Sequence, residues 1–563
     1  MLLAARSAVA LYRLLDAATA LAGDERVSRY FTLVPGSDFG VDMLSAIERV
    51  GGRSVPWAEA CSRSYDLILT ASPKGDLAHL RGRRVLLPHG AGYNKAIPGE
   101  GEGSAGSDSA SGLDAVLLSP ADGGGSSPIA LHAVAHPEQV ARIAVADRRA
   151  ADRAKVVGDP TLERLLASRA LRDQYRNALG TGPRTLLALT STWGPESLLR
   201  RHPDLPALLA TRLPHDTYQV ALIVHPNERS LLGAYELAER LAPALDAGLV
   251  LAEPHEEWAS VLVAADALLT DHGSAALYYC ATQDRPVVGL PRSGSELIPG
   301  SPVDGLLRGV PVLVPAAGQP TGGLAGGLER ALRSYVPGSG QGAARRAFAH
   351  QGQALRRLRS ELYALLGLVP PHFSSPPRLL PPPRPAARNP AAFDVHAEVE
   401  GDLVRVIRRP LSPDAPGDHL AAEYGVAREG VVRSAGLLYR RGRALAAHSD
   451  RKDPSWTAGG WVEYVLSAYP GCRSAVAVVS ADVMLFRSRG GEAACYTVRV
   501  EPLAEAGRIV RADPAAVASG VHAWFVGGVP RPLAAHSLSC AIGGRSYRVT
   551  VRPATGEEVM APF

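Results

Sequence analysis

The sequence predicts an α/β protein with two Rossmann-like domains facing each other across a deep cleft, followed by a Pro-rich linker and a β-rich C-terminal module. Over the first two-thirds of the chain, short apolar runs alternate with helical segments, which is typical of parallel sheets covered by helices. Two glycine-flanked histidines, His89 and His272, each follow such a run. Both should lie at the carboxyl edge of a sheet, where open α/β sheets bind ligands.

Changes of pattern along the chain predict the domain boundaries. We expect an N-terminal Rossmann-like (acceptor) domain over residues 1–154, a C-terminal Rossmann-like (nucleotide-donor) domain over 155–368, a Pro-rich linker over 369–390 and the β-rich module over 391–563. A chain of 563 residues is too long for one core. Its 46% hydrophobic and 20% charged residues are typical of a soluble globular protein.

In the first domain we expect strands at 30–34, 67–70, 85–87 and 115–118 and a helix at 41–50. Apolar residues between Leu11 and Leu21 recur at helical spacing and predict a helix that ends at Gly23. Arg13 and Asp16 interrupt this segment, which argues against a signal peptide. The Gly/Ser/Glu-rich stretch 99–112 is predicted to be a flexible loop, because its glycines neither follow a strand closely nor open a helix.

In the second domain we expect strands at 185–189, 220–224, 249–251 and 267–269, helices at 234–245 and 258–264, and one long Arg-rich helix at 343–366. The Pro-Pro pairs of the linker favour extended polyproline geometry and a semi-rigid segment. In the last module, alternating runs at 403–407, 483–487, 495–500 and 547–551 predict strands. No residues in that module have the spacing of a catalytic motif.

Composition limits the partners and the location. The formal charge of +5 is small for this length, and no basic run suggests nucleic acid. Five scattered cysteines without a C-x-x-C pair fit a reducing cytoplasm. No stretch approaches the ~20 apolar residues of a membrane span, so we expect a cytoplasmic protein with at most peripheral membrane association. Basic residues are nearly all arginine, and the abundance of Ala, Gly and Pro suggests an actinobacterial, GC-rich genome.

In the first domain, the His89 turn is the main candidate for chemistry. Gly90 leaves room for a substrate beside an imidazole of near-neutral pKa, although the ring could instead cap a turn. Lys74 and Lys95 stand out in an arginine-dominated chain, and a lysine is a compact cation suited to phosphate. Further candidate binding residues are Gly36 and Ser37, in the loop after the strand expected at 30–34.

In the second domain, the segment Asp271, His272, Gly273 and Ser274 opens a helix expected at 275–281. Such a helix start favours a phosphate or pyrophosphate, although Asp271 could equally be an ordinary N-cap with nothing bound.

Two other strand ends in the second domain carry candidates. His225 follows the strand expected at 220–224, and Pro226 after it forces an extended exit that points the ring into the cleft. Ser191 and Thr192 place hydroxyls where the strand at 185–189 ends. These hydroxyl groups could bind phosphate oxygens, and they are equally typical of residues in a turn.

The order of these segments resembles the CDP-glycerol glycerophosphotransferase family, the teichoic-acid-type polymerases and primases of GT-B architecture. That family has, in order, Trp-His-Gly-Thr, a Gly-x-Pro segment, Pro-Thr-Trp-Arg, His-Pro and Thr-Asp-Tyr-Ser-Ser. This chain has Pro-His-Gly at 88–90, Gly-Asp-Pro at 158–160, Ser-Thr-Trp at 191–193, His-Pro at 225–226 and Thr-Asp-His-Gly-Ser at 270–274. The resemblance covers residues 25–300.

The resemblance implies roles for these residues. His89 becomes the base that deprotonates an acceptor hydroxyl, and His225 the residue that stabilises or protonates the leaving nucleotide phosphate. The segment 271–274, with Ser191 and Thr192, would hold the donor pyrophosphate. The chain has no D-x-D triplet, so neither a metal nor another cofactor is expected. The rings of His89 and His272 should lie exposed on facing domains.

The chain also departs from the family pattern, which leaves three functions open. Pro88 replaces the aromatic residue before His89, Gly194 replaces an arginine, and 272–273 is His-Gly in place of Tyr-Ser. The first function is a transferase that moves a glycerophosphoryl or glycosyl group from a CDP- or UDP-activated donor to an acceptor hydroxyl. Its acceptor would be a lipid-linked precursor of a cell-envelope polymer at the inner face of the plasma membrane.

The second function is a catalytically inactive GT-B scaffold or nucleotide-ligand-sensing protein. The third is a nucleotide-sugar 2-epimerase, which needs further carboxylates in the cleft. Glu253, Glu256 and Glu257 form the only obvious cluster, and a solvated helix start explains them as well.

Overall fold

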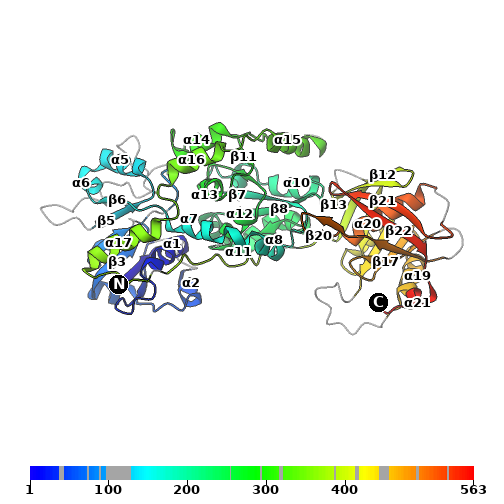
Figure 1. Cartoon of the computed structure of the whole chain (residues 1–563), viewed down its shortest axis with the longest axis horizontal. Helices are drawn as coiled ribbons and strands as arrows, with labels where there is room; N and C mark the ends of the chain where they lie inside the picture. Colours follow the sequence, from blue (N-terminus) through cyan, green and yellow to red (C-terminus); the bar gives the residue numbers. More distant parts are fainter. Residues whose placement is uncertain are drawn as a thin grey trace.

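The computed structural model describes residues 1–36, 43–72, 75–87, 90–96, 129–253, 255–291, 294–315, 321–373, 375–385, 388–412, 417–442, 456–489, 494–528 and 532–563. They form two parallel sheets covered by helices and a closed β-barrel. Figure 1 shows these three parts in a row, with the N-terminus at one end and the barrel at the other. The expected pair of α/β domains and the β-rich C-terminal module are therefore confirmed.

The first sheet has the strand order β2-β1-β3-β4-β5-β6, and all of its pairs are parallel. Its strands are β1 (Leu2–Ala5), β2 (Tyr30–Leu33), β3 (Ser64–Thr70), β4 (Arg81–Leu86), β5 (Ile129–Val134) and β6 (Ala154–Val156). Its helices are α1 (Ala8–Ala18), α2 (Met43–Arg49), α3 (Trp57–Ser62), α5 (Pro137–Ala146) and α6 (Arg148–Ala151), with 3₁₀ turns η1 (Thr19–Leu21) and η2 (Leu77–His79). The strand expected at 115–118 and most of the stretch 99–112 lie outside the described residues.

The N-terminal segment differs from the expectation of a helix alone. Leu2–Ala5 forms β1, which is buried at every position and lies between β2 and β3. Its four apolar residues are too few to show a period of two, so they merge with the helical pattern that follows. The Ser7 side chain then accepts a hydrogen bond from the Ala10 amide and starts α1.

The second sheet has the order β11-β10-β7-β8-β9, again with parallel pairs. Its strands are β7 (Thr185–Ser191), β8 (Tyr218–Val224), β9 (Val250–Leu251), β10 (Ala267–Thr270) and β11 (Val287–Gly289). The first four coincide with the expected strands. The helices are α7 (Pro160–Ala167), α8 (Arg172–Ala178), α9 (Leu198–Arg201), α10 (Leu205–Arg212), α11 (Pro226–Asp246), α12 (Glu257–Ala264), α13 (Ala275–Thr282), α14 (Pro302–Gly309), α15 (Thr321–Arg333) and α16 (Ser339–Ala347), with the 3₁₀ turn η4 (Ser168–Leu171).

The prediction of a single long helix at 343–366 is wrong. The chain instead forms α16 and a separate helix α17 (Ala354–Leu366), because His350 and Gly352 between them have positive φ and break the helical path. Helix α17 returns to the first sheet, where Leu358 and Leu362 are fully buried in that sheet's core. The last helix before the Pro-rich segment therefore packs on the N-terminal domain.

The Pro-rich segment, which we term the strap (residues 369–390), contains no helix or strand among its described residues. It packs along the second domain: Leu380 is only 3% exposed and belongs to that domain's core. The Tyr175 hydroxyl donates to the Leu380 carbonyl at 2.7 Å, and the Ser260 hydroxyl donates to the Pro381 carbonyl at 2.6 Å. The strap is thus a packed part of the molecule between α17 and the barrel.

The barrel closes in the order β12-β13-β21-β22-β18-β17-β16-β15-β14. Its strands are β12 (Ala392–Glu400), β13 (Leu403–Pro410), β14 (His419–Glu423), β15 (Leu437–Arg441), β16 (Ser474–Val478), β17 (Val483–Ser488), β18 (Tyr496–Val500), β21 (His536–Ile542) and β22 (Arg545–Pro553), with a hairpin β19 (Leu503–Glu505)–β20 (Arg508–Val510). Helices α18 (Glu429–Ser434), α19 (Ala458–Ala468), α20 (Pro514–Val526) and α21 (Gly556–Val559) complete it. Helix α20, apolar on nearly all sides, packs against strands from around the barrel and fills its core.

A buried ion-pair cluster fastens the barrel to the second domain. Arg408 of β13 is completely buried, and its guanidinium lies 2.6 Å from Asp216, just before β8, and 2.8 Å from Asp513, which caps α20. The His215 amide also donates to the Arg408 carbonyl. The two carboxylates compensate the buried cation, so this contact holds the two parts in a fixed relation.

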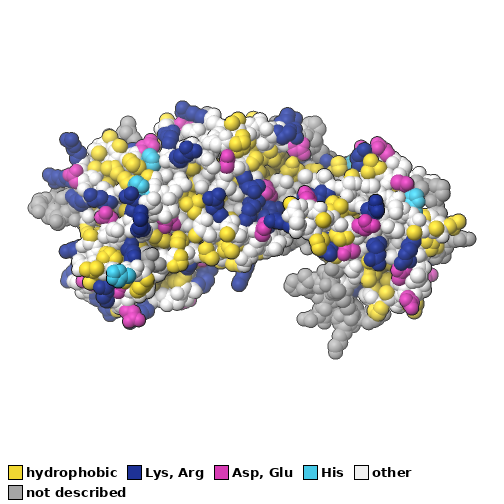
Figure 2. Space-filling view, viewed as in Figure 1, with side chains coloured by type: hydrophobic (Ala, Val, Ile, Leu, Met, Phe, Trp, Pro, Cys, Tyr) yellow, Lys and Arg dark blue, Asp and Glu magenta, His cyan; other side chains and the backbone are white. Residues whose placement is uncertain are grey.

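The distribution of charge on the surface and the character of the helices both bear on what the molecule could bind. Figure 2 shows Lys and Arg side chains spread over the visible face among acidic and apolar ones. Among the described residues, no helix combines the length and apolar character needed to cross a membrane.

Candidate functional site

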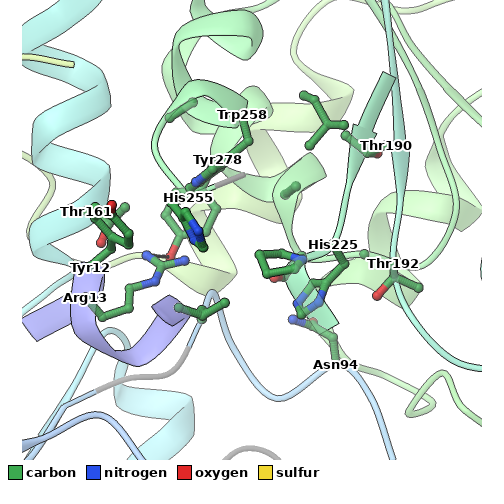
Figure 3. A pocket seen from close by; sticks show the side chains of 18 of the residues that line it. Tyr12, Arg13, Asn94, Thr161, Thr190, Thr192, His225, His255, Trp258 and Tyr278 are labelled. Atoms are coloured by element: carbon green, nitrogen blue, oxygen red, sulfur yellow. Dashed lines mark hydrogen bonds between the residues drawn. The ribbon is translucent and has the colours of Figure 1, made fainter. Parts of the chain in front are cut away.

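A cavity of about 220 Å³ lies where the carboxyl ends of the two sheets meet. Both α/β domains line it. The first contributes, among others, Tyr12, Arg13, Gly90, Asn94, Lys95, His132 and Gln139, and the second Ser191, Thr192, Trp193, His225, His255, Trp258, His272, Gly273, Ser274 and Tyr278. Figure 3 shows two ends: Tyr12 and Arg13 lie beside His255, Trp258 and Tyr278, which we term the aromatic end, and His225 lies with Thr192 and Asn94 at the other, which we term the histidine end.

His225 stands between β8 and α11 and caps that helix. Its Nδ1 accepts a hydrogen bond from the Asn227 amide at 3.1 Å, and Pro226 occupies the first helical position. Because Nδ1 is the acceptor, the proton of the neutral ring is on Nε2. The residue therefore presents an N–H donor at the start of a helix, where anions are favoured.

Asp271 organises the loops at the histidine end and does not itself line the cavity. Its carboxylate accepts hydrogen bonds from the amides of Thr192 at 2.8 Å, Leu198 at 2.9 Å and Gly273 at 2.9 Å. Burial, the largest effect, raises the pKa of this carboxyl group, while His272 and the three amides act in the opposite direction. Asp271 thereby ties the end of β7 to the start of α13.

The expectation that the His272 ring is exposed is wrong. The residue is only 8% exposed, and its Nε2 lies 3.1 Å from Oε2 of Glu296, which is 2% exposed. The same carboxylate oxygen lies 2.9 Å from Nζ of Lys95. His272 is thus part of the cavity wall in a polar cluster, His272–Glu296–Lys95, which spans both domains.

Lys95 also explains why position 194 carries no side chain. Its ammonium group donates to the Trp193 carbonyl and lies 4.2 Å from the centre of the Trp193 ring. A Cβ on Gly194 would come within 2.8 Å of the Lys95 nitrogen and 2.9 Å of Glu296, and Gly194 has φ +95°. The space that a side chain at position 194 would occupy is therefore taken by the Lys95 ammonium group of the other domain and by the Glu296 carboxylate.

The loop after Gly90 joins the two domains beside the cavity. The Ala96 amide donates to the Glu296 carbonyl at 2.7 Å, and the Ile298 amide donates to the Asn94 carbonyl at 2.9 Å. A Cβ on Gly90 would lie 3.5 Å from the Ser274 hydroxyl. The two glycine turns that the sequence singles out therefore meet at one side of the cavity.

The aromatic end contains residues that sequence reasoning missed. The Arg13 guanidinium donates to the Tyr278 hydroxyl at 2.7 Å, which in turn donates to Asp159 at 2.7 Å. Tyr12 stacks on His255 with ring centres 5.1 Å apart. The available signal was the pair of polar residues, Arg13 and Asp16, on an otherwise apolar N-terminal helix.

The remaining predicted residues lie in different places. The Ser191 hydroxyl donates to the Thr192 carbonyl at 3.1 Å and accepts from the Leu199 amide at 3.2 Å. Gly36 does not line the cavity, and its carbonyl accepts from Arg6. His89, Lys74 and Ser37 lie outside the described residues.

The carboxylates considered for an epimerase all have partners. Glu253 and Glu256 line the cavity, but Glu253 pairs with Arg229 at 3.2 Å and Glu256 pairs with Arg164 at 2.6 Å. Glu257 accepts from the Arg384 and Glu253 amides and is not part of the lining. Within the described part of the chain, no three His, Cys, Asp or Glu side chains are grouped to hold a metal ion.

Comparison with known proteins gives low similarities. No protein-family model matches the sequence, and no curated protein matches it. Among solved structures, the wall teichoic acid polymerase TagF matches with 13% identity and a TM-score of 0.42, covering 65% of this chain and 88% of the polymerase. A structure of a variant of that polymerase, soaked with CDPG, matches with 12% identity and a TM-score of 0.45. It covers 65% of this chain and 88% of the polymerase.

The Anabaena protein HepE in complex with UDP-glucose gives 15% identity and a TM-score of 0.39, covering 64% of this chain and 99% of that protein.

Proposed function

We propose that this chain is a GT-B-like transferase that binds a CDP- or UDP-activated donor in the cavity and transfers a glycerophosphoryl or glycosyl group to an acceptor hydroxyl. One observation carries the proposal: anion-binding groups and an aromatic wall converge on a single cavity between two parallel sheets. The helix starts at His225 and Ser274 supply the anion-binding groups. The aromatic wall consists of Tyr12, His255 and Trp258.

The donor would lie along the cavity with its diphosphate at the histidine end. There, the Nε2–H of His225 and the start of α13 offer hydrogen-bond donors to phosphate oxygens. The nucleobase would lie at the aromatic end, because a flat ring gains contact area and stacking there.

In the proposed reaction, the acceptor oxygen forms a bond to the transferred group as the bond to the nucleotide phosphate breaks. Glycerophosphoryl transfer would release CMP, and glycosyl transfer would release UDP. Negative charge develops on the leaving phosphate, where the Nε2–H of His225 would stabilise it by a hydrogen bond. The resemblance assigns removal of the acceptor proton to His89.

The test is a thermal-shift screen with CDP-glycerol, CDP-ribitol, UDP-sugars and GDP-sugars. We expect one donor to raise the melting temperature and His225→Ala to abolish that shift. His536→Ala is the control, because this histidine lies on the barrel, paired with Asp402. The absence of a shift with every nucleotide would instead support a scaffold, and interconversion of a UDP-sugar without acceptor would support an epimerase.

A further inference from the structure

His272 and Glu296 form a histidine–carboxylate pair in the wall of the cavity. The ring Nε2 lies 3.1 Å from Oε2 of Glu296, which is 2% exposed. A carboxylate only accepts hydrogen bonds, so Nε2 carries the proton of the neutral ring. The lone pair is then on Nδ1, and the carboxylate fixes the tautomer and orientation of the ring as the Asp does in a Ser-His-Asp triad.

The Nδ1 atom of His272 keeps accessible surface in the cavity wall. It makes no hydrogen bond with the described residues, and it is not one of the side-chain atoms that are buried without a partner. Because the residue lines the cavity, this nitrogen can meet a bound group. His132 of β5 lines the same cavity without this access, since its Nδ1 is buried and has no partner among the described residues.

The second sheet places His272 and His225 on opposite sides of one strand end. Strand β7 lies between β10 and β8, and continuing its two parallel registers brings both histidines level with Thr192. Two strand spacings of about 4.8 Å each separate their backbones by about 10 Å. That spacing fits a phosphoryl group or a sugar carbon with one histidine on each side of it.

Lys95 and Trp193 connect the two histidines through direct contacts. The Lys95 Nζ lies 2.9 Å from Glu296 Oε2 and 4.2 Å from the centre of the Trp193 ring. The centre of that ring lies 6.3 Å from the centre of the His225 ring. The histidine–carboxylate pair and His225 are therefore parts of one site.

We propose that His272, held by Glu296, is the catalytic base that takes the proton of the acceptor hydroxyl. The proposal rests on the proposed function, and it gives His272 the step that the resemblance assigns to His89. The acceptor oxygen forms its bond to phosphorus or to the sugar carbon, and its proton passes to Nδ1. The electron pair of the breaking bond leaves with the nucleotide phosphate beside His225. The His272 cation is stabilised by Glu296 and loses its proton to water after the products leave.

The test is nucleotide release from CDP-glycerol and from UDP-glucose by the full chain, with glycerol as the acceptor. We expect the native protein to release CMP or UDP from one of these donors. His272→Gln keeps an N–H donor for Glu296 but has no basic nitrogen, so kcat should fall at least about 100-fold while the donor KM stays within about threefold. His272→Ala should lose as much, and added imidazole should raise its kcat at least about tenfold, which a merely structural ring would not allow.

Two further variants separate catalysis from structure. Glu296→Gln tests the positioning residue: at a temperature where the variant is folded, kcat should fall at least about tenfold with the donor KM unchanged. His536→Gln is the matched control, because His536 also pairs with a carboxylate, Asp402 at 2.7 Å, but lies on the barrel and does not line the cavity. This control should release nucleotide at the native rate.

A chemical readout needs no turnover. Diethyl pyrocarbonate acylates accessible, neutral imidazole nitrogens, and mass spectrometry of the treated native protein should find His272 modified. An unmodified His272 would show that Nδ1 is closed and would overturn the proposal.

The kinetic outcomes separate this proposal from the proposed function. The base assignment is overturned, and the transferase stands, if the native protein is active and His272→Gln keeps its kcat. The same holds if imidazole restores His89→Ala but not His272→Ala. If the native protein releases no nucleotide from either donor, the transferase and the base assignment fail together.

Discussion

Replacing His132 by Phe should change how stability depends on pH. The folded-state pKa of His132 is about 4, below the ordinary value of 6.5. Below pH 6.5 the unfolded chain binds a proton here that the folded chain does not. The contribution of the neutral ring is therefore present above pH 6.5 and is lost as the pH falls toward 4.

The magnitude follows from the two pKa values. A pKa difference of 2.5 is equivalent to about 3.4 kcal/mol when both states are fully titrated, and about 2 kcal/mol of it is lost between pH 7.5 and pH 5. Phe cannot bind a proton, so the unfolding free energy of the variant should not show this decrease. At pH 7.5 the variant should also be more stable, by about 1–3 kcal/mol, because the unpartnered nitrogen is gone.

The assay is urea denaturation of both proteins at pH 7.5 and pH 5, followed by a signal from the first domain. The difference in unfolding free energy between variant and native protein should grow by about 2 kcal/mol at the lower pH. An equal pH dependence in the two proteins would refute the assignment of His132 as a buried, neutral ring whose Nδ1 has no partner among the described residues.

Three further substitutions test the contacts around the cavity and the barrel. Glu296→Gln removes the charge that Lys95 and His272 share and should destabilise the protein by about 3 kcal/mol, which thermal unfolding measures; an unchanged melting temperature would contradict the buried cluster. Gly194→Ala should cost about 1–3 kcal/mol, because of its positive φ and its contact with Lys95, and a neutral outcome in the same assay would contradict that geometry. Arg408→Leu leaves Asp216 and Asp513 without their buried partner and should cost about 3–5 kcal/mol, with faster proteolytic release of the barrel; unaltered cleavage would show that the ion pairs do not hold it.

Much of the fold could be predicted because apolar runs report directly on buried parallel strands. Strands β7 to β10 coincide with runs bounded by turn residues, and the alternating pattern of the last module indicated a β-rich domain. The short strand β1 and the break between α16 and α17 were missed. The four apolar residues of β1 are too few to show a period of two, and the helical pattern of 343–366 runs through the break that the positive φ of His350 and Gly352 imposes.

The site could be predicted only where its residues follow strands. Position at a strand end brings His225, Thr192 and Ser274 to the cavity, since carboxyl ends of parallel strands share one edge. Glu296 follows no motif, and its contacts with Lys95 and His272 depend on tertiary structure. His132 lies within a strand, where the sequence shows a single polar residue among apolar ones and does not reveal that it faces a cavity.

The most direct test of the proposed transferase is a crystal structure with CDP-glycerol or UDP-glucose bound. The diphosphate should lie within hydrogen-bond distance of His225 Nε2 and beside the start of α13, with the base against Tyr12, His255 and Trp258. A donor bound elsewhere, or a cavity that stays empty at saturating nucleotide, would contradict it.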